Sequence, residues 1–172
     1  MRNFRTLYLV PFIIIFYVLS GCSSVKRENE EATKFLNFYI QEVLQKDTIS
    51  LFENSYKHPG NDCLIKSIDS VKKSIPLNKQ DPRFKWENIP RAKILKDTEL
   101  PNRYTFSRSD FKKKYPSGLY IISQPVFSKD FNYVILHQGY LCGEMCGTGW
   151  IEMYQKTAKG WKQIKKYLCW IS

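Results

Sequence analysis

Histidine is scarce in this sequence, since His58 and His137 are the only two. The chain also lacks the nucleophile elbow G-x-S-x-G, the metal-binding pattern H-E-x-x-H and the phosphate-binding P-loop. A C-x-x-C-H motif for haem attachment is absent as well. These absences remove the common sequence signals for hydrolysis, phosphoryl transfer and haem chemistry. We therefore expect a protein that is not an enzyme and that has no cofactor and no metal site.

A hydrophobic run long enough to span a membrane is also missing. The apolar stretch from Thr6 to Ser20 contains Pro11 and is shorter than the roughly 20 residues that a spanning helix needs. Arg2 and Arg5 precede it, with no acidic residue nearby. This order is typical of the charged and apolar regions of a signal peptide, which we favour over the alternative of a transmembrane anchor.

The apolar stretch ends in Leu19-Ser20-Gly21-Cys22, which resembles the lipobox of a bacterial lipoprotein signal peptide. The resemblance implies that residues 1–21 are removed and that Cys22 carries a diacylglyceryl group and an acyl chain such as palmitate. Two or three chains hold a protein on a membrane, whereas one chain binds only marginally. Similar lipoproteins without Asp after the cysteine usually reach the outer membrane, and here Ser23 follows. We expect a lipid-anchored envelope protein, on the outer membrane rather than the inner one.

The rest of the chain divides into a short tether and one domain. Residues 22–31 are polar and mixed in charge, which predicts a tether between the lipid and the folded part. Residues 32–172 are of a length that suits a single domain, and they contain no internal repeat. The oligomeric state stays open.

Acidic residues are few, with 16 against 27 basic ones and a formal net charge of +11. In a cytosolic protein this charge would suggest nucleic acid, but the export signal argues against that partner. The anionic partners of an envelope protein are lipid headgroups, lipopolysaccharide, peptidoglycan and acidic glycans. The alternative is a solvated basic surface without a specific partner. The densest basic run, Lys112–Lys114, follows a candidate cap at Ser109-Asp110 and predicts an exposed short helix or loop.

The first half of the chain has helical periodicity. Apolar residues recur at helical spacing over residues 32–44, and a second helix with Leu64, Ile65 and Ile68 is expected from Asp62 to just before Pro76. Between them, Asp47 is a candidate cap for a short helix carrying Ile49, Leu51 and Phe52. Residues 91–96 predict a short edge strand.

The last third is rich in β-branched and aromatic residues. Strands are expected over residues 119–127, 133–141, 149–155 and 161–170, with turn signals between them. This order predicts an α+β domain whose N-terminal helices pack on one face of a four-stranded antiparallel meander. The order of elements is similar to the cystatin-like and nuclear-transport-factor-2-like folds. The segments Tyr140–Gly147 and Cys169–Ser172 look like the ending of uncharacterised bacterial lipoproteins, a resemblance that implies no activity.

Four cysteines remain besides Cys22, and they are Cys63, Cys142, Cys146 and Cys169. An exported chain with an even number of cysteines is usually oxidised, but sequence does not choose among the three pairings. The expected hairpins place Cys142 opposite Cys146, and Cys169 near Cys146 or Gly147. We therefore expect these three to cluster, with at least one disulfide among them or to Cys63.

The sequence supports a metal site and a carbohydrate-binding site less well than disulfides. A zinc site with His137 as fourth ligand would have the unusual spacing H-x4-C-x3-C. Glu152 alternates with Trp150 and Tyr154, as in a carbohydrate-binding face, but aromatic residues on a sheet are more often core. The sequence thus favours a non-enzymatic binding or envelope-interaction module. The alternative is an envelope enzyme that uses thiol chemistry at Cys142, Cys146 or Cys169.

Overall fold

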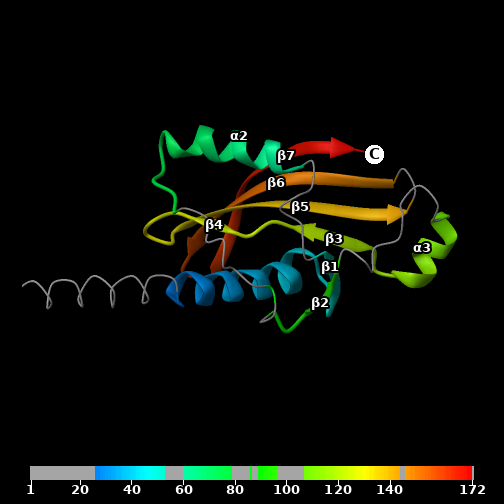
Figure 1. The fold of residues 1–172 in the computed structure, drawn as a ribbon. Coiled ribbons are helices and arrows are strands. Elements are labelled where there is room, and N and C mark those ends of the chain that lie inside the picture. Colours follow the sequence, from blue (N-terminus) through cyan, green and yellow to red (C-terminus); the bar gives the residue numbers. More distant parts are fainter. Residues whose placement is uncertain are drawn as a thin grey trace, which may run out of the picture.

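A mixed β-sheet lies between two helical layers in the computed structural model of the chain (Figure 1). The structure describes residues 26–52, 60–78, 86, 89–96, 107–143 and 146–171. The first helix spans residues 26–38 and continues into a π-helical segment, η1 (Tyr39–Val43). The other elements are β1 (Ile49–Phe52), α2 (Gly60–Lys72), β2 (Ala92–Leu95), α3 (Arg108–Lys114), β3 (Leu119–Ile122), β4 (Val126–Phe127), β5 (Tyr133–Gly143), β6 (Cys146–Thr157) and β7 (Gly160–Ile171).

The strands follow the order β2-β1-β3-β5-β6-β7, and β4 pairs with β5 in line with β3. β1 is parallel to both β2 and β3, whereas the pairs formed by β5, β6 and β7 are antiparallel. The predicted fold, an antiparallel meander of four strands with all helices on one face, is therefore wrong. The expected similarity to the cystatin-like and nuclear-transport-factor-2-like folds is wrong for the same reason.

The error lies in β1, which the sequence presented as a short capped helix. Ile49 and Leu51 are both buried, and they alternate along a strand rather than lining one side of a helix. β1 pairs with β2 and β3, which come much later in the chain. Parallel pairing needs such a long crossover, and no local pattern announces it.

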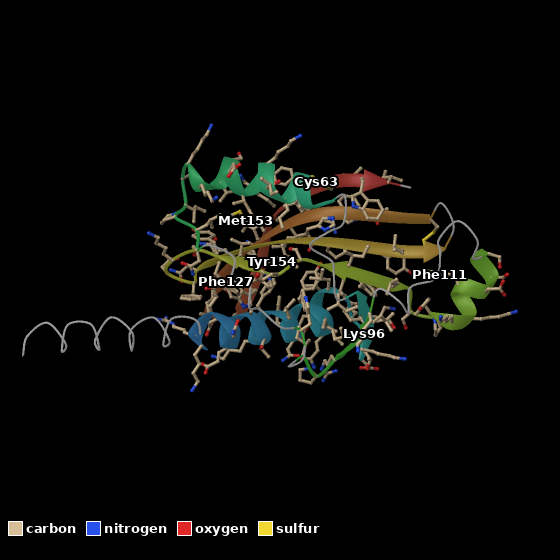
Figure 2. All side chains as sticks on the ribbon, in the orientation of Figure 1. Cys63, Lys96, Phe111, Phe127, Met153 and Tyr154 are labelled. Carbon is tan, nitrogen blue, oxygen red and sulfur yellow. A yellow bond between two sulfur atoms is a disulfide. The ribbon has the colours of Figure 1, made fainter. Side chains whose placement is uncertain are left out.

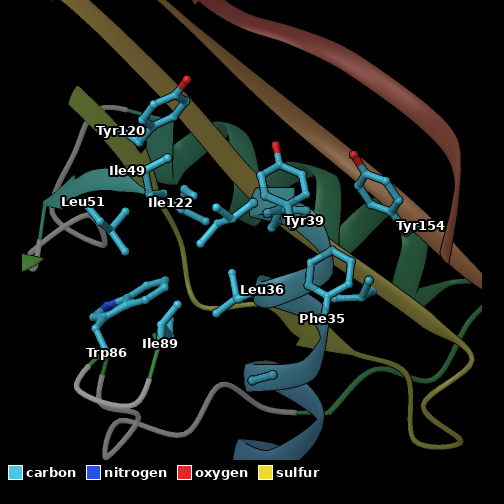
Figure 3. Packing of buried hydrophobic residues seen from close by; sticks show 14 of the residues in the cluster. Phe35, Leu36, Tyr39, Ile49, Leu51, Trp86, Ile89, Tyr120, Ile122 and Tyr154 are labelled. Carbon is cyan, nitrogen blue, oxygen red and sulfur yellow. The ribbon is translucent and has the colours of Figure 1, made fainter. Parts of the chain in front are cut away.

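The first helix and η1 cover one face of the sheet, which we call the first-helix face. The expected helix from Ala32 is longer than predicted, because residues 26–31 of the expected tether are helical too. Ala32, Phe35, Leu36 and Tyr39 are almost completely buried there. Figure 3 shows how Phe35, Leu36 and Tyr39 pack against side chains of β1, β3 and β6.

Helix α2 covers the opposite face, which we call the α2 face. Leu64 and Ile68 pack on Ile135, Ile151 and Met153. Side chains of successive residues in β5 and β6 therefore point alternately to the two faces of the sheet. The helix begins at Gly60 and ends at Lys72, close to its predicted bounds.

Helix α3 closes one end of the sheet, where Phe111 and Tyr115 pack on Leu95 and Leu119. Its N-cap is Ser107 rather than the predicted Ser109-Asp110, because the Ser107 hydroxyl accepts a hydrogen bond from the Asp110 backbone N–H at 3.2 Å. The lysine run of residues 112–114 is exposed on this short helix, as expected. Among the described residues, no helix is long and apolar enough to cross a membrane.

Candidate functional site

The four cysteines form two separate disulfides, Cys63–Cys169 and Cys142–Cys146. Their Cα atoms are 6.0 Å and 5.1 Å apart, within the range for a disulfide. The prediction of at least one such bond is confirmed. The lipid-attachment residue Cys22 lies outside the described residues.

The three C-terminal cysteines do not cluster as predicted. Cys169 lies beside Gly149 and Trp150 of β6, not beside Cys146 or Gly147. Two β-bulges in the β6–β7 pairing shift the register, and each adds a residue to β7. Sequence gives the turn but not the bulges.

The two disulfides have different surroundings. Cys142–Cys146 closes the end of the β5–β6 hairpin, where it is visible as a sulfur–sulfur bond in Figure 2. Cys63–Cys169 joins α2 to β7 across 106 residues of sequence. Since all four sulfur atoms are paired, thiol chemistry at any of these cysteines would first require reduction.

His137 does not join the cysteines in a zinc site. Its side chain is 1% exposed, and its Nε2 accepts a hydrogen bond from the Trp170 indole N–H at 3.3 Å. Within the described ranges, no three histidine, cysteine or acidic side chains converge so that they could hold a metal ion. The zinc alternative therefore gains no support.

Trp170 fixes the C-terminal end of β7 on the α2 face. Its indole lies against Gly139, Gly147 and Gly149, and a Cβ atom at Gly149 would overlap the ring. These glycines therefore provide the space in which the indole sits. The repeated glycines in β5 and β6 are the sequence signal for this space. Without the strand register, the sequence does not show that Trp170 fills it.

Glu152 is the centre of a buried polar cluster on the first-helix face. Its side chain is 1% exposed. The hydroxyl groups of Tyr39 and Tyr154 donate hydrogen bonds to Oε2 at 2.9 Å and 2.7 Å, and Lys166 Nζ lies 2.8 Å from Oε1. The cluster thereby connects η1, β6 and β7.

Burial, reinforced by the nearby Glu152 carboxyl group, raises the pKa of Tyr39 well above its ordinary value. The pKa of Tyr154 is raised for the same two reasons. Both hydroxyls thus keep the protons that they donate. Because Tyr154 and Glu152 are buried under the helix, they are not part of an open carbohydrate-binding face, and the core interpretation of Tyr154 is confirmed. This cluster stabilises the fold and offers no access to a substrate.

The most exposed part of the sheet is β7. Its central residues Lys162–Leu168, which we call the β7 edge surface, are seven consecutive exposed residues. Ile164, Tyr167 and Leu168 are 38%, 48% and 49% exposed. Exposure of successive residues means that both sides of the strand are open to solvent, because side chains alternate between the faces. The sequence predicted this strand as the last of a meander, and it is the last strand of the observed sheet.

Positive charge accompanies these apolar side chains. Lys166 pairs with Glu152, but within the described part of the chain no acidic group pairs with Lys162 or Lys165. The edge of a sheet also presents backbone N–H and C=O groups that can pair with another chain. The β7 edge surface is therefore the candidate binding site.

Comparison with known proteins gives no assignment, because no family model, no curated protein and no solved structure matches the chain.

Proposed function

We propose that this protein is a lipid-anchored lipoprotein of the bacterial envelope and that its folded domain is a non-enzymatic binding module. The lipobox-like Leu19–Cys22 supports the anchor, and Ser23 in place of Asp after the cysteine supports an outer-membrane location. The observation that carries the binding role is the β7 edge surface, where Tyr167 and Leu168 remain half exposed beside Lys162 and Lys165, which form no ion pair with any described residue. Exposed apolar side chains along an edge strand whose backbone groups are free to pair are typical of an interaction site.

The anchor brings this surface close to the membrane. Residue 26, only a few residues after Cys22, is already part of the first helix, so the domain would stand near the lipid headgroups. From that position the positively charged edge can meet membrane-bound or periplasmic partners that carry negative charge.

Metabolic labelling tests the anchor. Cells given an alkyne analogue of palmitate should label the wild-type protein, and Cys22→Ala should abolish the label while the unprocessed precursor accumulates. Cys142→Ala/Cys146→Ala is the matched control, since it removes cysteines that the lipobox does not involve. Equal labelling of wild type and Cys22→Ala would contradict the anchor.

Thiol counting separates the binding module from a thiol enzyme. The purified, denatured protein should contain no cysteine of residues 63, 142, 146 or 169 that reacts with a maleimide before reduction. A thiol at any of these positions in protein from the envelope would contradict the non-enzymatic role and support thiol chemistry.

A further inference from the structure

We infer that the β7 edge surface binds an extended acidic segment of another envelope protein, which adds to the sheet as a further strand beside β7. This inference rests on the proposed binding role and names its partner by chemistry. Three properties of the edge support it: the backbone, the charge and the placement of the apolar side chains.

The backbone favours a strand as the occupant. β7 is the last strand of the sheet, and among the described residues nothing pairs with its outer side. The exposed stretch Lys162–Leu168 is about 23 Å long at roughly 3.3 Å per residue. On either side of the bulge between Gln163 and Lys165, the outer side of β7 offers a partner strand backbone donors and acceptors, as in other complexes formed by strand addition.

The charge favours an acidic partner. Lys162 and Lys165 form no ion pair with any described acidic residue, and neither does Lys159 in the turn before β7. Opposite charges on adjacent strands stabilise pairing, and like charges destabilise it. The same lysines therefore disfavour a second copy of β7 as the occupant.

The apolar side chains extend contact to both sides of the added strand. Tyr167 pairs with Ile151 and so lies on the α2 face, whereas Leu168 pairs with Trp150 and lies on the first-helix face. A partner strand with apolar residues next to its acidic ones would cover both.

A lipid surface fits the edge less well. Docking the edge onto a bilayer would bury the free N–H and C=O groups of β7 without partners, which is unfavourable in lipid. An added strand satisfies the same groups.

A synthetic peptide of alternating valine and glutamate tests the inference against the full chain purified in detergent. Fluorescence anisotropy should show binding that Lys162→Glu/Lys165→Glu weakens by about tenfold or more, because two attractive pairs become repulsive. The variant Lys112→Glu/Lys113→Glu makes the same charge change on α3 and should bind like wild type. Melting curves confirm that each variant is folded.

Backbone pairing is tested separately from charge. The same peptide with its central amides N-methylated keeps every carboxyl group but loses its donors, and it should not bind. Equal binding of the methylated peptide, or equal binding by the two lysine variants, would overturn strand addition. Failure of peptide binding with normal palmitate labelling would reject this inference and leave the anchor intact.

The two alternative occupants of the edge, a second copy of the chain and a lipid surface, would give distinct results. A stable dimer in sedimentation, crosslinked between the Lys165 residues of two copies, would assign the edge to a second copy. Protection of Lys165 from a water-soluble acetylating reagent on phosphatidylglycerol vesicles, but not on phosphatidylcholine vesicles, would assign it to the membrane. Either result would overturn the proposal.

Discussion

The two faces of the sheet hold their helices by different means. On the first-helix face, Phe35, Leu36 and Tyr39 are fully buried in the largest of the three core clusters, and neither disulfide involves the first helix. On the α2 face, Leu64 and Ile68 are buried in a smaller cluster, and the Cys63–Cys169 disulfide fixes the helix to β7.

The contrast shows that packing and crosslinking act as alternatives here. Burial of apolar surface stabilises the first helix in proportion to the area removed from water. A disulfide acts mainly by restricting the unfolded chain, and it does so more for a longer loop. Among the described residues of α2, Leu64 and Ile68 are the buried apolar ones and Ile65 is 51% exposed, so we expect the covalent bond to matter more to the position of this helix.

The largest effect is expected from Phe35→Ala. Phe35 is 0% exposed, and its ring contacts those of Tyr39, Phe127, Tyr154 and Trp161. The substitution should lower the free energy of unfolding by about 3–5 kcal/mol, measured by urea denaturation.

Two variants on α2 complete that measurement. Leu64→Ala should cost less, about 2–3 kcal/mol, because a smaller side chain leaves a smaller cavity. Ile65→Ala is the exposed control and should change stability by less than about 0.5 kcal/mol. A larger loss for Leu64→Ala than for Phe35→Ala would reverse the comparison between the faces.

Next in size is the loss of the long-range disulfide. Cys63→Ala/Cys169→Ala should lower stability by about 2–4 kcal/mol, because the bond closes a loop of more than a hundred residues. Cys142→Ala/Cys146→Ala is the matched control and should cost less, since its loop spans only four residues of sequence. Equal melting temperatures for the two double variants would show that the 63–169 bond does not stabilise α2 in this way.

The smallest effect concerns the buried tyrosines of the first-helix face. Because the folded-state pKa of Tyr39 is raised, its stabilisation is complete below the unfolded value of about 10 and is lost as the pH rises above it. Tyr39→Phe removes one hydrogen bond to Glu152 and should cost about 1.5 kcal/mol near neutral pH. Above about pH 10 the wild type should lose stability more steeply than the variant.

Tyr167→Phe is the control for that pH series, because Tyr167 is exposed on β7 and contributes no buried hydroxyl. Its denaturation midpoints should follow those of the wild type at every pH. If the Tyr39→Phe curve also runs parallel to the wild-type curve above about pH 10, the buried hydroxyl of Tyr39 is not the alkaline-sensitive group.

Part of this molecule could be predicted from local patterns. The apolar spacing of residues 32–44 is helical in the structure, and the β-rich runs of the last third are strands β3 to β7. The four cysteines besides Cys22 predicted a disulfide, and two are present. Each of these predictions depends on residues close together in the sequence, where periodicity and composition are informative.

Only the tertiary structure decided how these segments combine. β1 became a strand because β2 and β3 pair with it from more than 40 residues away, and α2 lies opposite the first helix because residues of β5 and β6 alternate between two faces. The bulges in β7 set the place of Cys169, and the strand order leaves Lys162–Leu168 at the edge. Sequence alone determined the lipobox-like signal, the basic charge and the local elements. Long-range strand pairing, which has no local pattern, determined the mixed sheet, and the bulges determined which residues of β7 face each side.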